Sequence, residues 1–148
     1  MSDILNKLHG QLCRITFWND YSFYWEGRVL ISDYDRHRWL GTFTISMNAQ
    51  PFKYRVDPIE ITYDASGDIE IPELAFTVTP RIYFTLTDEG GTAEIDFDDQ
   101  WGGSHHIEWA EGDEDKWHTI SLLNNKCTNA TVTLTDAEIV VEWREKSL

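Results

Sequence analysis

The 148-residue chain has only two cysteines and four prolines, and it has no long apolar run. Cys13 and Cys127 form neither a CxxC motif nor a disulfide framework, so we expect two buried or half-buried thiols. The longest apolar runs, such as 29–31 and 139–141, are far shorter than the roughly 20 residues of a membrane-spanning helix. The first residues also lack the basic and apolar regions of a secretory signal. We therefore expect no membrane segment and synthesis in the cytosol.

Basic side chains are scarce, since 12 Lys and Arg stand against 26 Asp and Glu and give a net charge of −14. Such a chain repels the phosphates of nucleic acids and the surface of anionic membranes, so neither is an expected partner. The sequence also lacks a GxSxG motif, a phosphate-binding loop and an evident Cys–His pair. We expect no enzymatic activity and no cofactor.

Two groups of residues have the chemistry of metal ligands without the spacing of a metal site. His106 and Glu108 would share one face of a strand, but two ligands do not complete a site. Asp96, Asp98 and Asp99 offer the oxygen donors that calcium takes, yet they do not follow an EF-hand pattern. An exposed acidic hairpin is the favoured interpretation, and no metal is expected.

Charge divides the chain sharply. Residues 1–55 hold seven basic and five acidic residues, a net of +2, whereas residues 56–148 hold five basic and 21 acidic residues, a net of −16. Pro51 and Pro58 lie at the change and discourage regular structure there. The predicted divisions are a partial N-terminal β segment, a connector with one strand at 59–63, and a C-terminal β-sandwich domain, with bounds 1–55, 56–72 and 73–148.

Twenty aromatic residues and frequent alternation of apolar with polar residues favour β-structure. One short helix is expected in the first ten residues, followed by a three-strand meander at 12–17, 23–32 and 42–48, with a polar link at 33–38. The acidic segment predicts an antiparallel sandwich or jelly roll. Its expected strands are 76–79, 81–87, 92–97, 105–109, 117–122, 130–135 and 138–144. The residues expected to face the core are Ile82, Phe84, Leu86, Ile139, Val141 and Trp143.

The aromatic residues also suggest binding surfaces. Most of them are expected to fill the sandwich core, but Trp101 lies beside Gly102 and Gly103 in an expected loop and is a candidate for ligand or partner contact. Jelly-roll modules that bind sugars stack pyranose rings on exposed aromatic side chains. One of two candidate functions is therefore a carbohydrate-binding module that recognises host cell-wall saccharides. It is the alternative to the structural role described below.

Three stretches and the C-terminus carry a family resemblance. The stretches are Leu8-His9-Gly10 with Arg14-Ile15-Thr16-Phe17, then Tyr24-Trp25-Glu26-Gly27-Arg28-Val29, then Phe43-Thr44-Ile45-Ser46-Met47 continuing to Pro51-Phe52-Lys53-Tyr54. The chain ends in Glu142-Trp143-Arg144-Glu145-Lys146-Ser147-Leu148. Together these motifs resemble those of distal tail proteins of long-tailed phages and prophages. Compared with the family, the sequence is shortened at the N-terminus.

The resemblance implies a galectin-like or jelly-roll sandwich after the Pro-aromatic-Lys-Tyr hinge, and a virion structural protein that links the tail tube to the host-adsorption apparatus. It implies assembly into a homo-oligomer, a hexameric ring if family-like. Further implied partners are tail tube, tape-measure, and tail-associated or receptor-binding proteins. The implied location is the virion tail tip, with assembly in the host cytoplasm. Because interface cores favour aromatics and arginine, the candidate subunit contacts are Arg14, Tyr24, Trp25 and Arg28.

Overall fold

The computed structural model describes residues 7–37 and 40–148. The regular structure is almost entirely antiparallel β-sheet, which confirms the predicted mainly β class. Chain contacts define two compact units. The first unit is Met1–Val56 with Ser147–Leu148, and the second unit is Asp57–Lys146.

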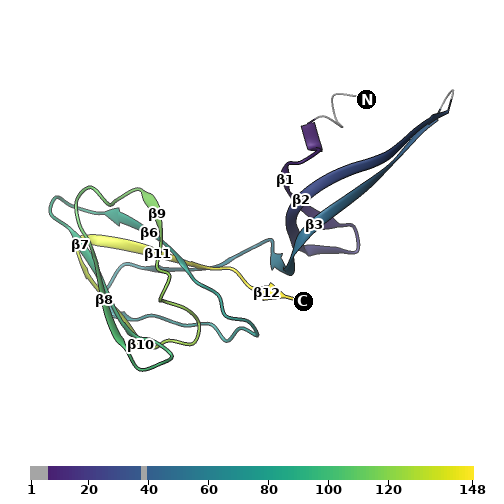
Figure 1. The fold of residues 1–148 in the computed structure, drawn as a ribbon. Coiled ribbons are helices and arrows are strands. Elements are labelled where there is room, and N and C mark those ends of the chain that lie inside the picture. Colours follow the sequence, from purple (N-terminus) through teal and green to yellow (C-terminus); the bar gives the residue numbers. More distant parts are fainter. Residues whose placement is uncertain (1–6, 38–39) are drawn as a thin grey trace. The chain divides into compact units, whose positions relative to one another are not determined.

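The first unit is built on one four-stranded sheet (Figure 1). Its strands, in the order β1-β2-β3-β12, are β1 Leu12–Phe17, β2 Asp20–His37, β3 Leu40–Arg55 and β12 Lys146–Ser147. The three consecutive strands β1, β2 and β3 form the predicted meander. The long β2–β3 hairpin extends through the segment that was predicted as a polar link, because backbone pairing continues from Asp35 opposite Thr42 to His37 opposite Leu40.

Strand β3 also continues past Pro51, a residue that the sequence analysis expects to discourage regular structure. The β2–β3 register shifts between the pair Trp25–Lys53 and the pair Gly27–Ala49, so β3 carries extra residues opposite one position of β2. A proline is tolerated at such a bulge because its missing N–H interrupts no regular ladder bond. Gly27 lies where the two backbones approach closely, since a Cβ at this position would be 2.6 Å from the Cα of Ala49.

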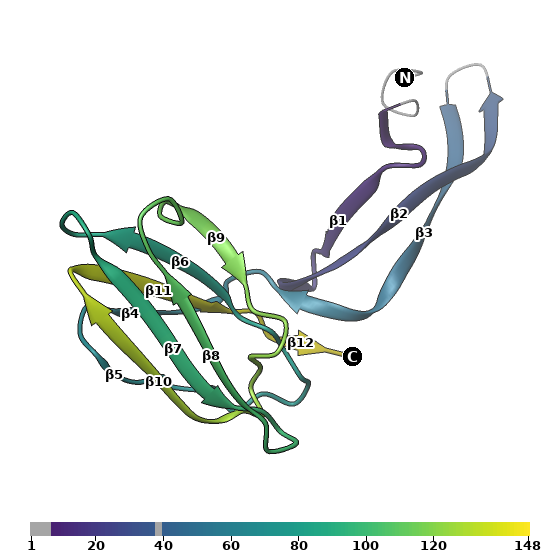
Figure 2. The ribbon, with the colours of Figure 1, turned by 60° about the vertical axis from the view of Figure 1, so that its left-hand side comes forward.

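The second unit is a sandwich of two four-stranded sheets, whose layers are visible in Figure 2. One sheet has the order β5-β10-β7-β8, with β5 Gly67–Asp68, β10 Thr128–Thr135, β7 Thr92–Asp98 and β8 Ser104–Trp109. The other has the order β4-β11-β6-β9, with β4 Ile59–Tyr63, β11 Ala137–Trp143, β6 Arg81–Leu86 and β9 Lys116–Thr119. The strand predicted at 59–63 is therefore present and pairs with β11.

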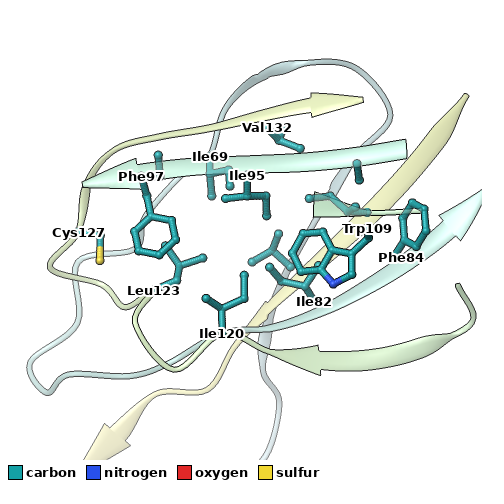
Figure 3. Packing of buried hydrophobic residues seen from close by; sticks show 14 of the residues in the cluster. Ile69, Ile82, Phe84, Ile95, Phe97, Trp109, Ile120, Leu123, Cys127 and Val132 are labelled. Atoms are coloured by element: carbon teal, nitrogen blue, oxygen red, sulfur yellow. The ribbon is translucent and has the colours of Figure 1, made fainter. Parts of the chain in front are cut away.

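The core of the sandwich comes from alternate residues of both sheets (Figure 3). Ile82 and Phe84 on β6 face Ile95 and Phe97 on β7, and all four are buried. The predicted core residues of β11, Ile139, Val141 and Trp143, are fully buried, and Leu86 is partly buried against the same cluster. A closed core of this kind stabilises the second unit without a disulfide bond. Its one cysteine, Cys127, is a buried free thiol.

The strand predicted at 76–79 is wrong, because residues 72–80 have no regular strand pairing. Val78 is nevertheless buried, and its N–H donates to the Asn125 side-chain Oδ1 at 2.9 Å rather than to a neighbouring strand. The Asn125 side-chain nitrogen in turn donates to the carbonyl of Leu74 at 3.2 Å. Pro72 and Pro80 bracket the segment and lack the N–H that a ladder needs.

The expected N-terminal helix is not confirmed. Residues 1–6 of that segment lie outside the described residues, and only Lys7 and Leu8 carry helical geometry in the described part of the chain. Gly10 adopts a positive φ of 78°, which is the conformation expected where a helix stops. Among the described residues, no helix has the length and hydropathy needed to cross a bilayer.

Candidate assembly surface

The sheet of the first unit has two chemically different faces. Residues directly opposite in an antiparallel pair share a face, and the register places Ile15 opposite Trp25, Val29 opposite Met47, and Ile31 opposite Ile45. Alternation along the strands extends this side into one surface that we name the apolar face. Its apolar side chains are Cys13, Ile15, Phe17, Phe23, Trp25, Val29, Ile31, Phe43, Ile45 and Met47. Lys53, opposite Trp25, lies on the same side with its Nζ 4.8 Å from the centre of the Phe23 ring.

The apolar face is incompletely covered. Val29 is the one buried side chain of this face. Phe17, Phe43 and Ile45 are exposed, and the other apolar side chains of the face are half-buried. Within the described residues of the first unit, Val29 and Tyr24 are the only hydrophobic side chains in the buried class. Antiparallel sheets normally pack one face on a core, and contiguous exposed apolar patches of this kind mark interaction sites.

The opposite side, which we name the polar face, is organised around Arg14 and Tyr24. The Arg14 guanidinium lies 4.8 Å from the centre of the Tyr24 ring, and its Nε donates to the Glu26 carboxylate at 2.9 Å. Tyr24 stacks on Tyr54 with ring centres 5.7 Å apart. The hydrogen bond to Glu26 and the charge interaction with Tyr24 raise the pKa of Arg14. These contacts hold the arginine over the ring in an arrangement typical of cation–π pairs.

The four predicted subunit contacts divide between the two faces. Arg14, Tyr24 and Arg28 share the polar face, where Tyr24 is buried under the arginine and the Arg28 guanidinium donates to the carbonyl of Gly10 at 2.9 Å. Trp25 lies on the apolar face, in edge contact with Phe17 at 5.3 Å between ring centres. The role of all four as subunit contacts stays a prediction.

Sequence reasoning did not select Phe43, Ile45 and Met47 as site residues, although it recognised their alternation as a half-buried strand. The available signal was that β1 and β3 both alternate between apolar and polar residues, which gives each strand one apolar side. Trp18 and Tyr21, in and beside the β1–β2 turn, were also not selected and are both strongly exposed.

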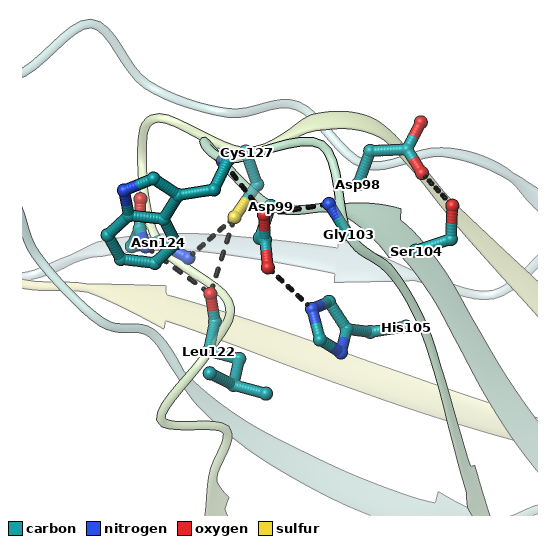
Figure 4. A network of polar contacts seen from close by, with 9 residues as sticks. Asp98, Asp99, Gly103, Ser104, His105, Leu122, Asn124 and Cys127 are labelled. Atoms are coloured by element: carbon teal, nitrogen blue, oxygen red, sulfur yellow. Dashed lines mark hydrogen bonds and ion pairs between the residues drawn. The ribbon is translucent and has the colours of Figure 1, made fainter.

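Trp101 is held in the loop between β7 and β8 and is 78% exposed. The carboxylate of Asp99 accepts the backbone N–H groups of Trp101 at 2.8 Å and Gly103 at 3.0 Å, and it contacts His105 Nε2 at 2.8 Å (Figure 4). The His105 bond first, and then the two backbone bonds, lower the pKa of Asp99 to about 2. This network fixes the loop that presents Trp101 as a candidate ligand or partner contact.

The acidic residues considered as calcium ligands are engaged with protein groups. Asp98 accepts from Ser104 Oγ at 2.6 Å and from the Asn129 side chain at 2.7 Å, and these two bonds lower its pKa. Asp96 contacts His106 Nδ1 at 2.8 Å and raises the pKa of that imidazole. Among the described residues, no group of three or more His, Cys, Asp or Glu side chains is arranged to hold a metal.

The fold is shared with a solved phage protein. The chain aligns with the crystal structure of SPP1 Dit, described as a paradigm of the hub adsorption apparatus in phages that infect Gram-positive bacteria. The TM-score is 0.59 and the sequence identity 18%, and the alignment covers 99% of this chain and 70% of SPP1 Dit. No family model and no curated protein matches the sequence. At this identity the similarity establishes a common fold, and function has to be argued from the surfaces.

Proposed function

We propose that the chain is a structural protein of a phage or prophage virion, a distal-tail-like component that links the tail tube to the host-adsorption apparatus. It acts by assembly and not by catalysis. The observation that carries the proposal is the apolar face, because a sheet with Phe17, Phe43 and Ile45 exposed on one side leaves apolar area that a partner can bury.

Two further observations support a tail role. The shared fold with SPP1 Dit extends over 99% of this chain, so both units take part in the likeness. The short motifs of the first unit and the C-terminus also resemble distal tail proteins. We propose copies of this chain as the first partner, in a hexameric ring if family-like. Tail tube, tape-measure, and tail-associated or receptor-binding proteins are the further partners, and the tail tip is the location after assembly in the host cytoplasm.

Sedimentation velocity of the purified chain over a wide concentration range tests the proposal. The expected result is a discrete oligomer whose population rises with concentration, because association buries the apolar face. A chain that stays monomeric at the highest attainable concentration, and that does not bind purified tail-tube or baseplate proteins, would contradict it.

The carbohydrate-binding alternative stays a proposal for Trp101. Its support is that the ring is exposed on a loop fixed by Asp99. If cell-wall saccharides change the tryptophan fluorescence of the native chain and leave that of Trp101→Ala unchanged, Trp101 is the contact. If saccharides leave the fluorescence spectrum of the native chain unchanged, the carbohydrate-binding alternative is wrong.

A further inference from the structure

The outward face of the sheet β4-β11-β6-β9 carries a hollow of about 270 Å³ in the second unit. Its lining residues are Glu60, Tyr83, Trp117 and Val140. The register explains why they meet, since Val140 pairs with Tyr83 and Tyr83 pairs with Trp117 in one row across three strands. Glu60 comes from the fourth strand, β4, and faces the same side.

The two aromatic rings of this hollow are not core residues. Their neighbours Ile82 and Phe84 point inward and complete the sandwich core, so Tyr83 points to the opposite side. The Tyr83 and Trp117 rings lie 5.3 Å apart at 59°, and Trp117 is 40% exposed. Backbone pairing on both sides of β6 fixes the spacing of the rings before any ligand arrives.

Charged groups flank the rings in an ordered way. The Arg81 guanidinium lies 4.5 Å from the centre of the Trp117 ring and 3.8 Å from the Glu142 carboxylate. Arg144 lies 3.8 Å from the same carboxylate, so Glu142 is neutralised by two arginines. Glu60 pairs in register with Glu142 and is exposed, and no described residue forms an ion pair with it. The hollow therefore has an apolar floor, a hydrogen-bond donor on one side and an acceptor on the other.

Charge selects among the possible occupants. An anion would meet Glu60 in a segment whose net charge is −16, and a cation on the Trp117 ring would be repelled by the Arg81 guanidinium beside it. A hydrocarbon would strip water from the Glu60 carboxylate without replacing its hydrogen bonds. A neutral pyranose avoids all three costs, because one face of the ring is apolar and its hydroxyls both donate and accept.

We propose that this hollow is a binding site for one neutral pyranose unit of a saccharide. The pyranose ring packs against the exposed Trp117 indole, with the Tyr83 ring tilted by 59° beside it, while its hydroxyls donate to Glu60 and accept from Arg81. The volume is near the lower end of small-molecule pockets, which begin at about 300 Å³, and so fits a single sugar ring rather than a long chain. The hollow and the apolar face share no residues. Saccharide binding can therefore be tested independently of the proposed assembly.

Ligand-observed saturation-transfer NMR on the full chain, with the methyl glycosides of glucose, galactose and N-acetylglucosamine as probes, tests the site. We expect at least one glycoside to bind with a dissociation constant of about 1 mM, a range typical of a single weak contact surface. Trp117→Ala should weaken that binding by about tenfold, because one aromatic stacking contact is lost. Glu60→Ala should also weaken it, and Trp117→Phe should restore most of it.

Trp18→Ala is the matched control, since it removes an exposed indole that belongs to neither candidate saccharide site. Native affinity in Trp18→Ala, together with weakened binding in Trp117→Ala, supports the proposal. Loss of binding in Trp101→Ala, with Trp117→Ala unaffected, assigns the sugar to Trp101 and overturns the proposal. Absence of saturation transfer for all three glycosides also overturns it. If Trp117→Ala does not fold by circular dichroism, Glu60→Ala carries the test, and unchanged binding in that variant refutes the site. Sedimentation of the same samples reports assembly separately.

Discussion

Serine substitutions at Ile45 and Leu30 compare the two faces of the first-unit sheet with a matched pair. Ile45 is 50% exposed on the apolar face, and Leu30 is 48% exposed on the polar face of the adjacent strand. Full burial of such a side chain is worth about 1.5–3 kcal/mol, so hiding the exposed half in an interface contributes about 1 kcal/mol. Ile45→Ser should therefore lower the association constant by roughly fivefold for each Ile45 side chain that the interface buries.

Sedimentation velocity and light scattering on the two variants, side by side with the native chain, measure the effect. Both substitutions place serine in a paired strand and lower the β-propensity at that position by a similar amount. An effect that comes only from weakened folding should therefore be equal in the two variants. We expect weaker association in Ile45→Ser and native association in Leu30→Ser. Equal weakening in both variants, or weakening in Leu30→Ser alone, would refute the assignment of the apolar face as the assembly surface. Ile45→Asp should enlarge the difference, because an interface would have to bury an unpaired carboxylate.

Three further predictions concern stability. Phe84→Ala should destabilise the second unit by about 3–5 kcal/mol in urea denaturation, since it empties a fully buried site, whereas Trp101→Ala should change the stability by less than about 0.5 kcal/mol. Gly27→Ala should disrupt the β2–β3 pairing, because the added Cβ would collide with the backbone of Asn48, and circular dichroism should show lost strand structure. The folded-state pKa of Asp99 is lowered from 3.8 to about 2, so its contribution to stability is complete above pH 4 and is lost as the pH falls toward 2. Urea titrations at several pH values should show a smaller acid destabilisation in Asp99→Asn, and an identical pH profile in both proteins would refute this.

Local alternation was sufficient to predict the sandwich core but not the segment around Val78. Ile139, Val141 and Trp143 alternate over one strand, and the period alone assigns them to the inside. Val78 is equally buried, but its N–H is satisfied by Asn125, a residue 47 positions away, and no local pattern reports such a bond. The sequence pattern of residues 76–79 therefore predicts a strand, although the hydrogen bonds of this segment do not form a ladder.

The candidate site was predictable only in part for a related reason. Alternation within β1 or β3 identifies an apolar side for each strand, but which sides coincide depends on register. At the bulge near Gly27 the β2–β3 register shifts by two positions, which keeps the parity, so Lys53 and Ile45 end on the same face of β3. A shift of one would have placed them on opposite faces. Tyr24 and Trp25 point to opposite faces because they are neighbours in a strand, but only the register shows that Trp25 shares its face with Ile45.

The two units differ in how they meet the requirement for a core. In the second unit, two sheets bury each other's apolar sides, and rings left on the outside, such as Trp117, are available for a ligand. In the first unit, one sheet holds the apolar side chains, and the described residues bury few of them. A single sheet gains stability by packing its hydrophobic face, so a partner on that face stabilises the folded unit by mass action. Under the proposed assembly, association and folding of the first unit are coupled, because the partner covers apolar side chains that the described residues leave exposed.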